Sequence, residues 1–112
     1  MTALNKLDSN NSDRFNSIIL DCLGCKWTIL LMDKIAGGIN RPGKLVKTAD
    51  GLTTKVLNQS LIRMIDYRII EKKSFAEIPP KVEYYLTPFG CELRQLLLEI
   101  KLLQSKYFER YI

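Results

Sequence analysis

The chain of 112 residues contains no histidine, three cysteines and one tryptophan. Without histidine, it lacks the side chain used most often for acid–base catalysis near neutral pH and for metal binding. It also has no glycine-rich phosphate-binding loop and no paired acidic motif. Three cysteines are too few for a four-ligand zinc site within one chain. These gaps argue against an enzyme and give no reason to expect catalytic residues, a cofactor or a metal ion.

Long apolar runs are also missing from the sequence. No stretch of about 18 apolar residues occurs, so we expect no membrane span. The first residues are polar and lack the apolar centre of a secretory signal, which predicts a cytoplasmic protein without a structural disulfide. We expect residues 1–12 to form a flexible tail and residues 13–112 to form a single domain.

Positive charge is concentrated in the middle of the chain. The formal net charge is +5, and residues 41–81 hold nine Lys or Arg against four Asp or Glu. Outside that segment the two kinds balance, with eight of each. A local excess of this sort favours an anionic partner such as the phosphate backbone of DNA, although a solvated basic face has the same composition.

The spacing of apolar residues predicts a mainly helical chain. Apolar side chains recur every three or four residues over several segments, and glycine or proline marks the turns between them. The predicted helices cover residues 14–23, 27–35, 44–49, 53–65 and 88–110.

The helix predicted over 53–65 has one apolar side and one polar side. Thr53 is a favourable N-cap residue, and the glycine-containing turn before it is typical of a helix-turn-helix. Amide and guanidinium groups suit the edges of adenine and guanine, and the threonine methyl suits thymine. The polar side carries Thr54, Lys55, Asn58, Gln59 and Arg63. An ordinary solvated face would also be polar, so this side is a candidate for reading DNA.

Two predicted strands follow this helix, over 68–75 and 81–87. Between them lie two prolines, which cannot sit inside a strand ladder. A hairpin directly after a helix-turn-helix is a wing, and its candidate phosphate contacts are Lys72, Lys73 and Lys81. Arg41, in the turn before the short helix, is a further candidate for contacting DNA. The sequence therefore predicts an α+β, mainly helical fold: a winged helix-turn-helix domain with a two-stranded hairpin.

The last predicted helix is long for so small a chain. Its roughly 20 residues would span about 30 Å, and its apolar stripe is broader than a single packing seam. We expect one side to enter the core of the chain and the other to meet a second subunit. Packing within one subunit alone is the alternative.

Three segments, in this order, resemble the HxlR family of winged helix-turn-helix transcription regulators, which are relatives of the MarR type. "LDCLGCKWTILLM" looks like the family's Leu-Asp-x-x-Gly-Gly-Lys-Trp opening of the second helix. "LTTKVLNQSLIRMIDYRII" is similar to the recognition helix and its exit. "EIPPKVEYYLTPFG" looks like the wing, Pro-Pro-(Lys/Arg)-Val-Glu-Tyr-x-Leu-Thr-x-x-Gly. The resemblance extends over about residues 14–105, and the wing motif is specific.

The resemblance implies a homodimeric DNA-binding regulator, located at the nucleoid when it is bound to DNA. The helix over 53–65 would enter the major groove of a pseudo-palindromic operator in double-stranded DNA, and the hairpin would contact phosphate or the minor groove. The resemblance names no effector. In such dimers the first and last helices build the interface, where the expected residues are Phe15, Ile18, Ile19, Leu96, Ile100, Leu103 and Tyr107.

The cysteines depart from the family pattern. Many members carry a redox-active cysteine followed by proline at the start of the first helix, where this chain has Arg14 and Phe15. Here Cys25 replaces the second glycine of the Gly-Gly-Lys-Trp pattern, and Cys22 takes a position that is usually aliphatic.

Several interpretations of the cysteine pair remain open. Both side chains fit an apolar face, and free cysteine often acts as a small buried apolar residue. A redox switch is the second interpretation, with Cys25 activated at a helix start beside Lys26 and Cys22 as its resolving partner. A zinc site would need the pairs of two subunits to meet at the interface. Cys91, near the start of the last helix, is predicted to lie in the core or the interface.

A second class of function also fits the sequence. Winged helices can dock proteins, and the long apolar helix could be a surface for another protein. The alternative is therefore a winged-helix protein-interaction module without specific DNA binding.

Overall fold

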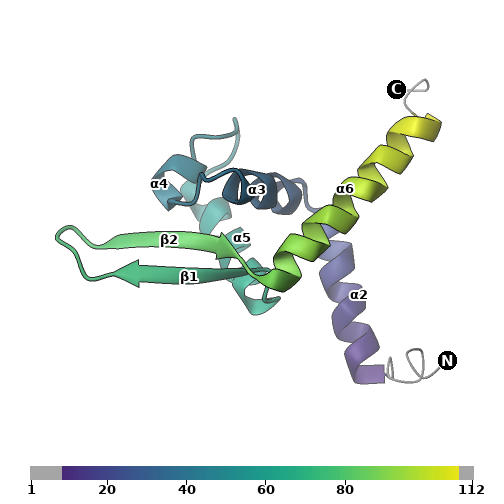
Figure 1. The fold of residues 1–112 in the computed structure, drawn as a ribbon, viewed down its shortest axis with the longest axis horizontal. Coiled ribbons are helices and arrows are strands. Elements are labelled where there is room, and N and C mark those ends of the chain that lie inside the picture. Colours follow the sequence, from purple (N-terminus) through teal and green to yellow (C-terminus); the bar gives the residue numbers. More distant parts are fainter. Residues whose placement is uncertain (1–8, 109–112) are drawn as a thin grey trace.

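The computed structural model describes residues 9–108, which form helices around a small antiparallel sheet (Figure 1). The fold class predicted from the sequence is confirmed. Within these residues no single helix has the length and apolarity to cross a membrane, although α2 and α3 together, as a bent pair, reach that composition. The elements are α2 (Ser9–Gly24), α3 (Lys26–Ala36), α4 (Pro42–Leu45), α5 (Thr54–Asp66), β1 (Ile70–Phe75), β2 (Lys81–Leu86) and α6 (Pro88–Phe108).

The first two helices meet at a sharp break. Cys25 adopts an extended conformation between α2 and α3 and is the N-cap residue of α3. Helix α2 begins at Ser9, before the helix start predicted at residue 14 and inside the segment predicted to be a tail. The rest of that segment, residues 1–8, lies outside the described part of the chain.

Helices α4 and α5 form the helix-turn-helix. The short helix begins at Pro42 and ends at Leu45, earlier than the predicted 44–49, because proline is well suited to the first turn of a helix. Gly51 has a φ of 84°, which only glycine adopts without strain, and it turns the chain toward α5. The hydroxyl of Thr53 accepts a hydrogen bond from the Val56 amide at 3.2 Å, so the predicted N-cap is confirmed.

The turn that ends α5 moves the start of the first strand to a later residue. Arg68 has a φ of 61°, and the Ile69 amide donates to the carbonyl of Met64 at 2.9 Å. This bond, together with the one from the Arg68 amide to the Ile65 carbonyl, satisfies carbonyls in the last turn of α5. For that reason β1 begins at Ile70 rather than at residue 68.

The hairpin is paired in a simple register that runs from Ile70 opposite Leu86 to Phe75 opposite Lys81. Figure 1 shows it extending away from α2 and α6, beside α4 and α5. The amide of Tyr84 also donates to the carbonyl of Asn40 at 2.9 Å, which attaches β2 to the segment just before α4.

Helix α6 is joined tightly to the end of α5. The hydroxyl of Thr87 accepts from the Gly90 amide at 2.9 Å and donates to the Arg68 carbonyl at 2.6 Å. A Cβ on Gly90 would overlap the carbonyl oxygen of Ile69, so only glycine allows this approach. The predicted C-terminal end near residue 110 lies outside the described residues.

The core is formed where α2, α3, α5, β1 and α6 meet. Ile65, at the edge of the apolar side of α5, is 37% exposed. The most completely buried large side chains are Leu31, Met32, Leu45, Leu57, Leu61, Met64, Ile69 and Ile70.

Candidate nucleic-acid interface

The polar side of α5 faces solvent. The helix buries Leu57, Ser60, Leu61 and Met64, which fixes the direction of the opposite side. All the polar residues predicted for reading DNA are on that exposed side: Thr54, Lys55, Asn58, Gln59 and Arg63. Thr53 is exposed too, but its hydroxyl already caps the helix.

One apolar residue on this helix was not foreseen. Ile62 is 68% exposed and lies in the same part of α5 as Asn58, Gln59 and Arg63. Its position one turn after Asn58 could have revealed it. An exposed aliphatic side chain on such a surface suits a thymine methyl group.

The lysines of the hairpin differ in their surroundings. Lys72 and Lys73 are exposed on β1, and the Lys73 ammonium lies 4.7 Å from the centre of the Tyr85 ring. Lys81 is half-buried and lies 5.0 Å from the centre of the Phe75 ring. The predicted wing cations are therefore not equivalent.

Glu83 explains this difference. Its carboxylate lies 2.9 Å from the Lys81 ammonium and 3.8 Å from the Arg41 guanidinium, and it accepts a hydrogen bond from the Tyr85 hydroxyl. The hydrogen bond from Tyr85 and the contacts with Lys81 lower the pKa of Glu83 below its ordinary value. Strand alternation predicts that Glu83 faces solvent, opposite Tyr84, but it is only 9% exposed because these partners surround it.

These elements match a known family. A sequence profile described as HxlR-like helix-turn-helix matches residues 22–111. The chain belongs to this family. An HTH-type transcriptional regulator of Synechocystis sp. is 35% identical over 92 residues, which cover 82% of this chain and 68% of the relative.

Solved structures agree with this HxlR-like assignment. A MarR-family transcriptional regulator from Enterococcus faecalis superposes with a TM-score of 0.76 at 30% identity, over 93% of each chain. The redox regulator HypR in its oxidised form superposes with a TM-score of 0.69 at 27% identity, over 80% of this chain and 93% of HypR. This HxlR-like protein is therefore a transcriptional regulator of the helix-turn-helix type.

The two neighbouring cysteines of this HxlR-like protein lie in different environments. Cys22 is fully buried, and burial, followed by the negative charge of Asp21, raises the pKa of its thiol to about 11. Burial also opposes ionisation of Cys25, yet hydrogen bonds from Thr28 and the Trp27 amide lower the pKa of the Cys25 thiol below its ordinary value. Cys22 is thus a buried thiol whose ionisation is disfavoured, and Cys25 is the more acidic of the two.

A charge from another helix assists Cys25. Arg63 of α5 favours the thiolate of Cys25, a contribution that the sequence did not reveal because the two residues are far apart in the chain. The neighbouring Lys26, which was expected to play this part, instead packs 4.5 Å from the centre of the Trp27 ring.

The other proposed cysteine roles fare differently. Cys91 was predicted to be in the core or the interface, and it is exposed on α6, so a core position is wrong. Among the described residues, no group of three His, Cys, Asp or Glu side chains is placed to hold a metal ion.

The residues predicted for a dimer interface are divided between core and surface. Ile18 is 6% exposed and packs in the core of the chain, so it has little surface left for a partner. Ile100 is half-buried against the same core. The rest are large apolar side chains that are 43–59% exposed: Phe15, Ile19, Leu96, Leu103 and Tyr107.

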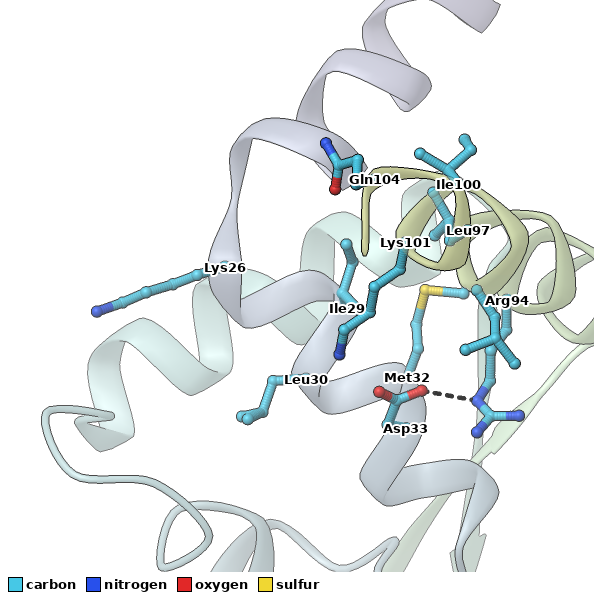
Figure 2. A pocket seen from close by; sticks show the side chains of 11 residues that line it. Lys26, Ile29, Leu30, Met32, Asp33, Arg94, Leu97, Ile100, Lys101 and Gln104 are labelled. Carbon is cyan, nitrogen blue, oxygen red and sulfur yellow. Dashed lines mark hydrogen bonds and ion pairs between the residues drawn. The ribbon is translucent and has the colours of Figure 1, made fainter. Parts of the chain in front are cut away.

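A groove of about 540 Å³ lies between α3 and α6. Figure 2 shows Arg94 hydrogen-bonded to Asp33 at one end, at 2.8 Å, and Lys101 reaching from α6 toward α3. Ile100, one of the residues predicted for the dimer interface, lines this groove. The other predicted interface residues of α6, Leu96, Leu103 and Tyr107, are not part of its lining.

Proposed function

We propose that this HxlR-like regulator is a homodimer that binds a pseudo-palindromic operator in double-stranded DNA. The observation that carries the proposal is the exposed polar side of α5 beside a projecting hairpin that bears lysines. In the proposed complex α5 enters the major groove and Lys72 and Lys73 contact phosphate. Two copies of α5, related by symmetry, would read half-sites about 34 Å apart.

The roles of the individual side chains follow from their chemistry. Asn58 and Gln59 carry amides that pair with adenine edges, and Arg63 carries a guanidinium suited to guanine. Lysines on the hairpin supply affinity that depends on salt but not on sequence. The excess positive charge of residues 41–81, which include both α5 and the lysines of the hairpin, supports these roles.

Selection of binding sequences from random double-stranded DNA tests the proposal. We expect an enriched sequence with two inverted half-sites whose centres are one helical turn apart. Enrichment of no sequence, or of single half-sites bound by a monomer, would contradict it.

Two substitutions then separate recognition of bases from contact with phosphate. Gln59→Ala should weaken binding to the selected operator by about 1–3 kcal/mol and relax one base preference. Lys73→Ala should weaken operator and random DNA alike and reduce the salt dependence of binding. Fluorescence anisotropy titrations at several salt concentrations measure both effects. Equal losses on both DNAs for Gln59→Ala would show that its assigned role is wrong.

We further propose that Cys25 makes this regulator responsive to oxidants or electrophiles. The acidic, half-buried thiol at the start of α3 and the charge of Arg63 on the DNA-facing helix support this idea. HypR, a redox regulator, has a similar fold. This proposal does not assign Cys22 the role of resolving partner. Burial raises the pKa of the Cys22 thiol and keeps it protonated.

A protein-interaction module is the second candidate function, and the groove between α3 and α6 favours it. Its lining is largely apolar, so a partner bound there would be held by contacts that salt does not weaken. Loss of DNA binding at all salt concentrations, together with salt-independent association with another protein, would favour this candidate over the first.

A further inference from the structure

Glu83 is an acidic side chain in the middle of a surface proposed to meet phosphate. A carboxylate there repels DNA and so lowers the affinity for it. A second role would explain why an acidic residue occupies this position. Its side chain is 11% exposed, so it is also largely withdrawn from water. The reason for its presence lies in the groups that it holds.

The register of the hairpin places these groups on one face. Glu83 pairs with Lys73, Phe75 pairs with Lys81, and Glu71 pairs with Tyr85, and directly opposed residues share a face of a sheet. On that face the Tyr85 ring lies under the Lys73 ammonium and its hydroxyl donates to Glu83. Glu83 thus anchors the Tyr85 ring through a hydrogen bond and the Lys81 ammonium through an ion pair.

Arg41 extends this network beyond the hairpin. It is the N-cap residue of α4, and its guanidinium lies 3.8 Å from the Glu83 carboxylate. The residue before it, Asn40, accepts the hydrogen bond from the Tyr84 amide. Two contacts from adjacent residues of β2 therefore hold the start of the helix-turn-helix against the wing.

We propose that Glu83 is a positioning residue for DNA recognition: it fixes the wing relative to the start of α4 and restrains Arg41 and Lys81. This inference rests on the proposed function. With their charges offset by Glu83, these two cations contribute less to binding DNA of any sequence. Discrimination then depends on α5, held at a set distance from a wing whose exposed lysines, Lys72 and Lys73, contact phosphate.

The chain offers a matched control. Glu83→Gln keeps the size of the side chain and its ability to accept the Tyr85 hydrogen bond, but it removes the charge. Glu71→Gln makes the same change on the same face of the hairpin, at an exposed residue that has no ion pair among the described residues. Both variants raise the net charge by one.

Binding to the selected operator and to random DNA, each as a function of salt, tests the proposal. We expect Glu83→Gln to lower the ratio of operator to random affinity about tenfold. Its salt dependence on random DNA should steepen by about one released counterion for each freed cation. Glu71→Gln should keep the ratio and the salt dependence of the native protein.

Three outcomes would overturn the inference. The two variants could change DNA binding alike, which would show that the change in net charge alone explains the effect of Glu83→Gln. Glu83→Gln could weaken both DNAs in parallel with unchanged salt dependence and a lower melting temperature, which would make its role purely structural. It could also leave every measured quantity unchanged.

Hydrogen exchange without DNA separates this inference from the proposed function. We expect the Tyr84 amide to exchange faster in Glu83→Gln than in Glu71→Gln, because its bond to Asn40 joins the two elements that Glu83 holds. Unchanged exchange would show that Glu83 does not position them. If the native protein binds no DNA while this difference is present, the proposed function fails and the attachment of wing to α4 stands.

Discussion

Cys22 and Cys25 show how strongly the surroundings of a residue control its chemistry. They are three positions apart, yet one thiol is buried in the core and the other belongs to the N-cap residue of α3. Desolvation disfavours the thiolate of Cys22, whereas hydrogen bonds and the charge of Arg63 favour that of Cys25. In the redox interpretation the sequence predicted Cys25 as the more acidic thiol, but it did not predict that burial would raise the pKa of Cys22.

Alkylation measures this difference directly. In a Cys91→Ala background, Cys25 should react with iodoacetamide, with a rate that rises with pH around a midpoint below that of an ordinary thiol. This follows because the thiolate is the nucleophile and the folded protein lowers the pKa of Cys25. Cys22 should stay unmodified until the protein unfolds.

Arg63→Gln provides the matched test of the charge from α5. It should raise the midpoint for Cys25, whereas Lys26→Gln should have the smaller effect, since Lys26 packs on Trp27. Mass spectrometry of the modified peptides gives the rates. An ordinary midpoint, with DNA binding unchanged after oxidation, would exclude Cys25 as a sensor.

At the scale of elements, the start of α6 lies in close backbone contact with the segment that follows α5. Thr87 bonds to both sides of this contact, and Gly90 lets the backbone of α6 approach that of Ile69. Because both partners at this contact are backbone, neither can move aside cheaply. A long helix proposed for dimerisation is thereby joined rigidly to the end of the helix proposed for reading DNA.

Gly90→Ala should therefore destabilise the protein. Alanine favours helices by about 1 kcal/mol over glycine, but the overlap with the Ile69 carbonyl should reverse the sign and leave a net loss of about 1–3 kcal/mol in the free energy of unfolding. Chemical denaturation measures this quantity.

Gly43→Ala is the control, since a Cβ at Gly43 in α4 meets nothing within 4 Å. That variant should be unchanged or more stable by up to about 1 kcal/mol. Equal stability changes in the two variants would mean that the close approach at Gly90 does not restrict the side chain.

At the scale of the whole molecule, the exposed apolar side chains are concentrated on α2 and α6. Figure 1 shows these helices at the end of the molecule away from the hairpin, so a partner bound there would leave α5 and the wing free. Separation of the two surfaces is what a symmetric dimer with two DNA-reading helices requires.

Leu103→Asp should convert the proposed dimer to a monomer. A buried leucine contributes about 1.5–3 kcal/mol, and symmetry counts it twice, so the dissociation constant should rise at least about a hundredfold. Sedimentation velocity over a range of concentrations measures it. Ile62→Asp makes the same change at a 68% exposed residue of α5 and should leave the dimer intact. If neither variant dissociates the dimer, the interface does not include Leu103.

The sequence by itself determined the elements and their order. Apolar spacing, the Thr53 cap, the Gly51 turn and the wing motif are local signals, and local backbone preferences and side-chain periodicity suffice to interpret them. Errors occurred at ends of elements, as at Ser9, where no strong signal marks the boundary.

Tertiary structure alone decided the chemical state of particular side chains. The burial of Cys22, which raises the pKa of its thiol, and the burial of Ile18 in the core depend on groups distant in sequence. Arg41 meets Glu83, and Arg63 acts on Cys25, only after the helices pack. Desolvation and Coulomb interactions depend on distance in space, so sequence separation cannot predict them.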